Sequence, residues 1–303
     1  MKHGYATNSP VDVYLANEHE ETMYMLRRDR DKNESDILAQ FLPAYTLSGC
    51  IDIDTAVSPI ILASPHSGRI YPKAWLTRCR VSQAALRKTE DIFVDRLFEP
   101  AAALGLPMLA AHFPRSFVDL NRSERERPPE PSMSADSIRE HNMPESRNSA
   151  LKPSRSAQPS ARALAGLGVV PTRISQSVDI YNTTPSRAVV SARLDALYFP
   201  YHRALGDLIA ATKARHGQAI LLDCHSMPGF GALQARRSDF ILGDRFGRAC
   251  SKTLIDLAQS TLTALGYSVT RNHPYAGGFT TAHYGKPARG IHALQIEINR
   301  DLY

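Results

Sequence analysis

The 303-residue sequence is poor in cysteine and has no long hydrophobic run. Its four cysteines are widely spaced and form no CxxC pair, which excludes a disulfide scaffold and predicts reduced thiols. The first residues lead into a polar stretch instead of the apolar core of a signal peptide. We therefore expect a cytoplasmic protein with no membrane partner.

Several catalytic motifs are also missing. The sequence contains no P-loop, GxGxxG, GxSxG or HExxH pattern, and no repeat of fixed period. The enzyme classes that depend on those motifs are excluded, and so is a solenoid. The hydrophobic content of 43% and charged content of 22% are ordinary for a soluble globular protein.

The net charge of +6 raises the question of nucleic-acid binding. The basic residues are scattered, however, and those between Arg122 and Arg127 alternate with glutamates. This pattern is typical of a solvated face and predicts no nucleic-acid partner. The positive balance also suits a small anionic substrate.

Strand-like and helix-like segments alternate along most of the chain, which predicts an α/β fold with a mostly parallel or mixed central sheet flanked by helices. Residues 1–54 are interpreted as an N-terminal extension, and 55–303 as a single α/β domain. A long loop is predicted at 128–158, where Pro, Ser, Arg and Glu dominate. One continuous helix is expected over 81–106.

Two apolar runs each stop at a histidine followed by small turn residues. They are Ser58–Gly68, which contains His66, and Ala219–Gly229, which contains His225. In open α/β sheets, ligands bind beyond the carboxyl ends of the strands. The two runs therefore predict strands that bring His66 and His225 to one edge of the sheet.

These histidines belong to a larger set of metal-capable residues. The others are Glu90, Asp91, His273, His283 and His292. A catalytic zinc ion usually has three His or Asp/Glu ligands and one open position. His66, His225 and one carboxylate from Glu90 or Asp91 would supply that set, although a lone histidine is more often a hydrogen-bonded structural residue.

Cys224 and Ser226 flank His225 and allow an alternative, a covalent mechanism with a thiol or hydroxyl nucleophile. Adjacent side chains on a strand point to opposite faces, so the side chains of Cys224 and His225 are expected to diverge. This alternative is therefore secondary.

Further blocks of the sequence form a recognisable pattern over about residues 58–303. The main ones are Ser64–Gly68, Glu90–Leu97, Asp119–Arg122, Tyr201–His202, Leu222–Pro228, Ile241–Arg245, Asn272–Phe279 and Gln295–Tyr303. These blocks resemble, in content and in order, the N-formylglutamate amidohydrolase family, whose members are also called deformylases. The resemblance implies a fold related to zinc carboxypeptidases and aspartoacylases, and a role associated with histidine degradation.

The resemblance further implies hydrolysis of N-formyl-L-glutamate to formate and L-glutamate, with one zinc ion per chain. His66, Asp91 and His225 become the expected zinc ligands. Glu90 is the reserve carboxylate, because Thr89-Glu90-Asp91 stands where relatives often have Asp-Thr-Asp. Glu297, flanked by apolar residues, is expected to act as the general acid and base.

A dianionic substrate needs cations whose geometry suits carboxylates. Asn121 and Arg122 resemble the Asn-Arg pair that related zinc hydrolases place on a substrate carboxylate. Further substrate-binding candidates are Arg300, Arg245, His283 and Tyr275. Three alternatives remain open: a zinc deacylase for a different N-acyl amino acid, a Cys or Ser amidase, and a non-catalytic binding protein. The oligomeric state is not assigned.

Overall fold

The computed structural model describes residues 33–49, 58–129, 160–175, 178–230 and 237–303. Within these residues a seven-stranded sheet has the order β1-β3-β2-β6-β9-β7-β8. Its strands are β1 (Tyr45–Ser48), β2 (Ile60–Ser64), β3 (Met108–Ala111), β6 (Ala219–Met227), β7 (Phe240–Gly243), β8 (Val269–Arg271) and β9 (Ile291–Asn299). Strands β4 (Arg173–Ser175) and β5 (Val178–Asp179) form a separate two-stranded sheet.

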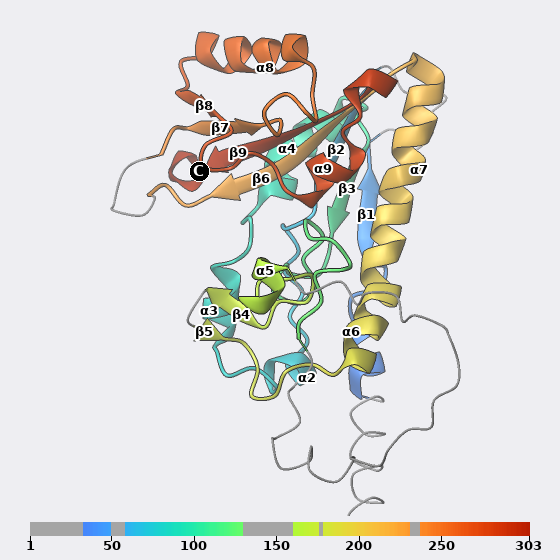
Figure 1. Ribbon diagram of the computed structural model, residues 1–303, viewed down its shortest axis with the longest axis vertical. Helices are drawn as coiled ribbons and strands as arrows, with labels where there is room; N and C mark the ends of the chain where they lie inside the picture. The colour runs from blue at the N-terminus through green and yellow to red at the C-terminus, as the bar shows by residue number, and fades with distance from the viewer. Residues whose placement is uncertain (1–32, 50–57, 130–159, 176–177, 231–236) are drawn as a thin grey trace, which may run out of the picture.

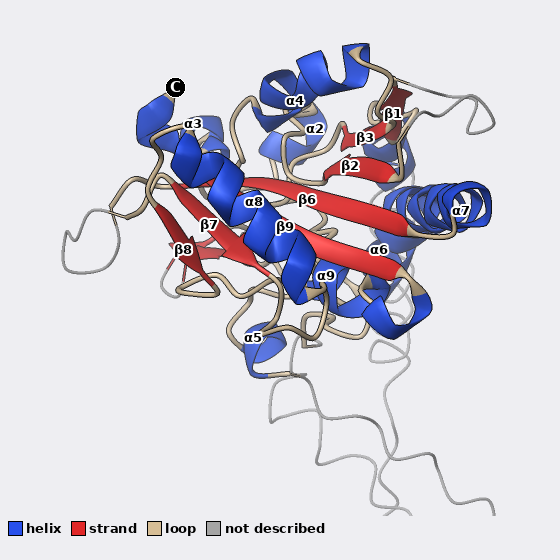
Figure 2. Cartoon of the chain, turned by 90° about the horizontal axis from the view of Figure 1, so that it is seen from above, coloured by secondary structure: helices blue, strands red, loops and turns tan. Residues whose placement is uncertain are grey.

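Helices lie on both sides of the large sheet (Figures 1 and 2). The α-helices are α2 (Lys73–Leu76), α3 (Gln83–Arg87), α4 (Val94–Ala103), α5 (Ala161–Leu164), α6 (Arg187–Arg193), α7 (Phe199–His216), α8 (Lys252–Ala264) and α9 (Phe279–Tyr284). A π-helical turn, η3 (Leu194–Tyr198), joins α6 to α7, and short 3₁₀ turns cover Pro287–Arg289 and Arg300–Leu302. The N-caps of α3, α5, α6 and α8 are serines, and each hydroxyl accepts a backbone N–H of the first turn.

The pairing of the strands confirms the predicted α/β class and the mostly parallel, mixed sheet. Strands β3, β2, β6 and β9 are mutually parallel neighbours, while β1 and β7 run antiparallel to β3 and β9. The carboxyl ends of the four parallel strands consequently meet at one edge of the sheet.

Alternating side chains divide the core between the two faces of the sheet. Ile61 and Leu221 belong to the large core that α7 contributes to. Their neighbours Leu62 and Leu222 face the other side, where Leu62 packs in the cluster of α4 and Leu222 packs against the clusters of α4 and α8. Both faces are therefore covered, which explains why these strands are almost wholly apolar.

The single helix expected over 81–106 was wrong, because residues 88–93 interrupt it. The N–H of Asp91 donates to the carbonyl of His66 (3.0 Å), and Phe93 adopts a left-handed conformation with φ of 58°. The chain therefore forms α3 and α4 with a turn between them. This turn carries Glu90 and Asp91.

Part of the predicted N-terminal extension joins the large sheet. Strand β1 pairs with β3, and Ile37 and Phe41 from the preceding segment are fully buried in the main core. Residues 1–32, and the predicted loop 128–158 beyond Pro129, lie outside the described residues. The division into an extension, a domain and a long loop stays a prediction. In the part of the chain that the structure describes, no helix is both long and apolar enough to cross a membrane.

His202 of α7 is a largely buried imidazole. Its Nε2 donates to the carbonyl of Leu120 (3.0 Å), and its Nδ1 lies 2.9 Å from the Tyr284 hydroxyl. Burial lowers the pKa of His202 to about 4, although the hydrogen bond to Leu120 opposes the shift. The folded protein therefore binds a proton at this ring less readily than the unfolded chain does.

This difference predicts acid sensitivity. Neutral His202 contributes fully to the free energy of unfolding above pH 6.5, the pKa of the ring in the unfolded chain. This contribution is lost as the pH falls toward about 4, the pKa in the folded protein. Between pH 7 and pH 5 we expect His202 to account for a loss of about 2 kcal/mol in the free energy of unfolding. Urea unfolding at both pH values measures it. The loss should shrink in H202Q and persist in H273Q, which changes an exposed histidine; an equal loss in both variants would contradict the assignment.

Candidate metal centre

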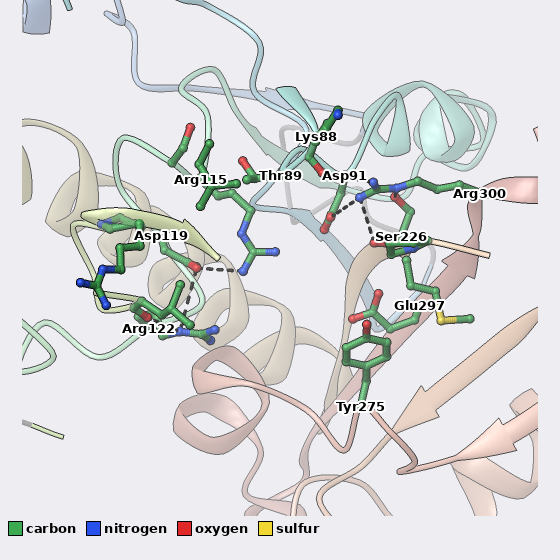
Figure 3. A pocket seen from close by; sticks show the side chains of 17 residues that line it. Lys88, Thr89, Asp91, Arg115, Asp119, Arg122, Ser226, Tyr275, Glu297 and Arg300 are labelled. Carbon is green, nitrogen blue, oxygen red and sulfur yellow. Dashed lines mark hydrogen bonds and ion pairs between the residues drawn. The ribbon is translucent and has the colours of Figure 1, made fainter. Parts of the chain in front are cut away.

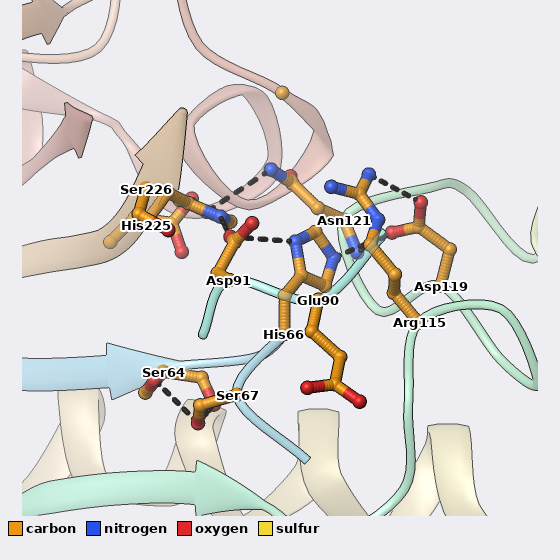
Figure 4. A network of polar contacts seen from close by, with 12 residues as sticks. Ser64, His66, Ser67, Glu90, Asp91, Arg115, Asp119, Asn121, His225 and Ser226 are labelled. Atoms are coloured by element: carbon orange, nitrogen blue, oxygen red, sulfur yellow. Dashed lines mark hydrogen bonds and ion pairs between the residues drawn. The ribbon is translucent and has the colours of Figure 1, made fainter. Parts of the chain in front are cut away.

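The sheet edge brings together three buried side chains from separate parts of the chain (Figure 4). His66 follows β2, His225 lies near the end of the adjacent strand β6, and Asp91 comes from the turn between α3 and α4. One ligand atom from each lies within 4.8 Å of the others, so the three could hold a metal ion.

Both imidazoles present Nδ1 to the same carboxylate. Asp91 Oδ2 lies 2.8 Å from Nδ1 of His225 and 3.4 Å from Nδ1 of His66. Among the described residues, His66 Nδ1 is buried without a hydrogen-bond partner. A buried nitrogen with an unused lone pair is costly unless a ligand occupies it, so this donor set fits a zinc ion.

Two further carboxylates lie behind the imidazoles. Asp119 Oδ1 is 2.8 Å from Nε2 of His66, and Asp223 Oδ2 is 3.1 Å from Nε2 of His225. Because a carboxylate can only accept, the contact with Asp119 favours a hydrogen on Nε2 of His66 and leaves its Nδ1 free to bind a metal. Sequence reasoning missed both roles. For Asp223 the signal was available, since it lies two residues before His225 on the same face of β6.

The electrostatics of the cluster keep Asp91 ionised. Burial alone would raise the pKa of Asp91, but the neighbouring imidazoles of His225 and His66 hold it well below its ordinary value. For His225, burial would lower the pKa, but Asp223 and Asp91 raise it well above the usual value. Such a concentration of negative charge attracts a cation.

Glu90 points away from the two imidazoles (Figure 4). Its Oε1 accepts a hydrogen bond from the Tyr71 hydroxyl (2.5 Å) and lies 3.4 Å from Nε of Arg87. Of the two consecutive acids, Asp91 is the one that lies beside His66 and His225.

Glu297 lies on β9 directly opposite His225 of β6 in the register of the sheet. Gln295 donates a hydrogen bond to its Oε1 (2.7 Å). Burial raises the pKa of Glu297 to about 7, although the charges of His225 and Arg115 oppose the shift. A carboxyl group with this pKa can both accept and donate a proton near neutral pH.

The cluster opens on a cavity of about 310 Å³ (Figure 3). Eight of its 17 lining residues are charged: Lys88, Arg115, Arg122, Arg173 and Arg300 carry positive charge, and Asp91, Asp119 and Glu297 carry negative charge. The cavity therefore combines a candidate metal site, a proton-transfer group and several cations.

Comparison with known proteins shows which family the chain belongs to. The model of the family described as N-formylglutamate amidohydrolase matches residues 58–303. The chain belongs to the N-formylglutamate amidohydrolase family. The residues that carried the resemblance in the sequence thus lie within the matched region.

Individual relatives agree with this assignment. The chain is 28% identical over 251 residues to an N-formylglutamate deformylase of Pseudomonas aeruginosa, covering 81% of this chain and 82% of that protein. It is 26% identical over 250 residues to one of Pseudomonas putida, covering 81% of each. A crystal structure of N-formylglutamate amidohydrolase from Ralstonia eutropha JMP134 superposes with a TM-score of 0.70 at 31% identity, covering 86% of this chain and 87% of that one.

In this member of the N-formylglutamate amidohydrolase family, Asn121 and Arg122 occupy different positions. Arg122 lines the cavity, with Nε donating to the Leu167 carbonyl (3.2 Å). Asn121 lies beside the candidate metal ligand instead, with Nδ2 3.4 Å from Nε2 of His225. Its Oδ1 accepts the N–H of Thr280 (2.8 Å), which fixes the orientation of the amide.

Arg115 is a cavity residue that sequence reasoning missed. It donates to Asp119 Oδ2 (2.8 Å), while Asp119 Oδ1 contacts His66. Burial would lower the pKa of Arg115, but the charges of Asp119 and Asp91 raise it above its ordinary value. A lone arginine after a strand carries no sequence pattern, so only the fold shows its proximity to the metal cluster.

The remaining substrate-binding candidates are divided by the structure. Tyr275 lines the cavity. Arg245 donates to the Gly277 carbonyl (3.3 Å), and the His283 ring stacks on Phe279 with centroids 4.9 Å apart. Neither Arg245 nor His283 is among the residues that line the cavity.

Cys224 lies on the opposite face of β6 from His225, as expected. It packs in the hydrophobic cluster beneath α4 as a free thiol, and burial raises its pKa well above the ordinary value. A thiol that resists ionisation is a poor nucleophile. Ser226 Oγ accepts a hydrogen bond from Arg300 (3.1 Å). The geometry therefore gives no support to a covalent mechanism at either residue.

Arg300 lines the cavity but also acts as a clamp on the turn that carries Asp91. Its guanidinium donates to Asp91 Oδ1 (3.3 Å), to the carbonyl of Glu90, and to both Oγ and the carbonyl oxygen of Ser226 (3.1 and 3.4 Å). These contacts tie the end of β9 to the candidate metal ligand and to the end of β6.

We therefore expect Arg300→Lys to weaken metal binding, because a lysine ammonium cannot span these acceptors in a fixed geometry. Loss of a group that orients a metal ligand typically costs about 10- to 100-fold in affinity. Competition with a zinc-sensitive chelating dye measures the change. Arg289→Lys, in the 3₁₀ turn before β9, is the control. Equal zinc affinity in R300K and wild type would contradict the role of Arg300 in positioning Asp91.

Proposed function

We propose that this protein hydrolyses N-formyl-L-glutamate to formate and L-glutamate, with a zinc ion held by His66, Asp91 and His225. The observation that carries the proposal is that Asp91, which lies within ligand distance of His66 and His225, lines the same cavity as Glu297 and several arginines. The names of the Pseudomonas and Ralstonia relatives support the choice of substrate.

The fit of the metal rests on the chain's own atoms. Two buried Nδ1 atoms and one carboxylate form the open three-ligand set that catalytic zinc sites use. When bound, zinc would supply Lewis-acid activation of water and of the formyl carbonyl. Asp119 holds the His66 imidazole in the tautomer that binds, and the carboxylate of Asp223 lies 3.1 Å from Nε2 of His225.

Glu297 is the residue that we assign to proton transfer. With a pKa raised to about 7, its carboxylate accepts a proton from the attacking water. The same carboxyl group then donates that proton to the nitrogen of the leaving glutamate. Protonation of this nitrogen is required because an amide anion is a very poor leaving group.

The cavity's cations fit a substrate with two carboxylates. Arg122 is the group that we assign to one carboxylate, since a guanidinium can pair with it through two parallel hydrogen bonds. Arg115 lies on the same side of the cavity, next to Asp119 (Figure 3). An N-acyl amino acid with a neutral side chain carries only its α-carboxylate and would leave part of this positive charge without a partner, which favours a dianion.

The experiment is a formate-release assay with purified protein, N-formyl-L-glutamate and parallel zinc analysis, with and without a chelator. We expect about one zinc ion per chain and formate release that the chelator abolishes and added zinc restores. Zinc with no formate release would reject this substrate and direct the search to other N-acyl amino acids. Full activity in a metal-free protein would reject the metal mechanism.

A further inference from the structure

Two side chains from the helix behind the cavity hold the backbone on both sides of Asn121. Tyr198, the last residue of η3, donates its hydroxyl to the carbonyl of Arg122 (2.9 Å). His202, one turn further along α7, donates from Nε2 to the carbonyl of Leu120 (3.0 Å). Residues 120–122 are thereby attached to one face of one helix.

We propose that Tyr198 and His202 are positioning residues that orient Arg122 toward a substrate carboxylate. The inference rests on the proposed function, because it concerns the affinity of the same cavity for its substrate. Neither residue lines the cavity, so both act only through the segment that they hold.

The path from the helix to the cavity is short. The guanidinium of Arg122 donates from Nη1 to the carbonyl of Asn121 (2.9 Å) and from Nε to the carbonyl of Leu167 (3.2 Å), so the backbone that the helix holds supplies one of the two acceptors that fix it. Arg122 then lines the cavity with its charged group. Bidentate pairing between a guanidinium and a carboxylate depends strongly on geometry, so a small shift of this backbone should weaken substrate binding.

The π-helical turn places Tyr198 and His202 toward this segment. A regular α-helix advances by about 100° per residue, and a π turn adds one residue to a single turn. Without the turn at Leu194–Tyr198, the residues of α7 would be rotated by about that angle relative to α6. Such turns are uncommon and often lie at functional sites, which fits a role in aiming these two side chains.

Aromatic packing fixes both side chains. The rings of Tyr198 and His202 lie with centroids 4.3 Å apart, and Phe279 of α9 lies 5.5 Å from His202. Because a carbonyl only accepts, His202 carries its hydrogen on Nε2, and the Tyr284 hydroxyl, 2.9 Å from Nδ1, donates to the His202 carbonyl (3.0 Å). The two donors are thus held in a rigid cluster of rings.

The chain offers a matched control on the same helix. Tyr201 is equally buried, and its hydroxyl also points to a backbone carbonyl, that of Leu109 in β3 (3.4 Å). Tyr198→Phe and Tyr201→Phe each remove one buried hydroxyl, the first at the end of η3 and the second in α7. Only Tyr198→Phe removes a contact to the Arg122 segment.

The test is steady-state kinetics of the zinc-loaded variants on N-formyl-L-glutamate. For Y198F we expect KM to rise about tenfold with kcat nearly unchanged, since one buried carbonyl loses its donor. Y201F should match the wild type. In an R122Q background, Y198F should change KM less than twofold, because the arginine that the tyrosine orients is gone. H202L should raise KM as Y198F does, and H202Q, which retains an N–H donor, should recover part of the loss.

An unchanged KM in Y198F, a fall in kcat alone, or the same rise in KM with and without Arg122 would overturn the proposal. Failure of the proposed function itself is distinguishable, because the wild type would then release no formate. In that case amide hydrogen exchange of residues 118–123 decides the inference. Faster exchange in Y198F but not in Y201F supports the attachment, and equal exchange in the two variants rejects it.

Discussion

Replacing Glu297 by glutamine is expected to lower kcat by about 10²- to 10⁴-fold while the protein keeps its zinc. Glutamine has nearly the same shape as glutamate but can neither accept the proton of the attacking water nor return it to the leaving nitrogen. It is also neutral, like the protonated form that burial already favours at this position. The fold and the metal ligands should therefore tolerate the change.

Formate release and elemental analysis of the same E297Q preparation measure both quantities. Glu99→Gln is the matched control, because Glu99 is an exposed residue of α4 that pairs with Arg96 on the surface (3.0 Å). Full turnover by E297Q would remove Glu297 from the mechanism. Loss of zinc together with turnover would instead assign Glu297 a role in holding the metal.

The positions of His66 and His225 could be predicted from the sequence because each is reached by a simple rule. Each histidine follows or ends an apolar strand, and neighbouring parallel strands bring their carboxyl ends together. Glu297 follows the same rule, since β9 is parallel to β6 and in register with it. Hydrophobic periodicity and strand length are therefore enough to predict where a residue lies when it belongs to a regular sheet.

Asp91 illustrates what the sequence pattern could not give. The periodicity over 81–106 favours one helix, which would place Glu90 and Asp91 on a helical surface. The hydrogen bond from the Asp91 N–H to the His66 carbonyl breaks that helix, and it depends on a residue 25 positions earlier in the chain. Local propensity cannot report a long-range contact that overrides it.

Long-range contacts also explain why the roles of Arg300 and Arg115 could not be predicted from the sequence. Arg300 was expected to bind substrate, but most of its guanidinium contacts go to the turn that carries Asp91 and to Ser226. Arg115 was not predicted at all, yet it lies in the cavity beside Asp119. In the sequence, an arginine in a loop looks the same whether it stabilises the fold or binds the substrate. Only the positions of its hydrogen-bond acceptors in the structure distinguish the two roles.

Replacing His66 by glutamine is expected to abolish zinc binding, because only two ligands remain and the Asp119 carboxylate loses its imidazole partner. Added zinc should raise the melting temperature of the wild type, since a ligand that binds only the folded state stabilises it by about 4 kcal/mol at 1,000 times its dissociation constant. H66Q should show no such rise and no zinc by elemental analysis. His112→Gln, a histidine outside the cluster whose Nε2 bonds to Thr46 (2.6 Å), should keep both. A zinc-dependent rise of equal size in H66Q would show that the metal is held without His66, and would reject the three-ligand site from which the mechanism begins.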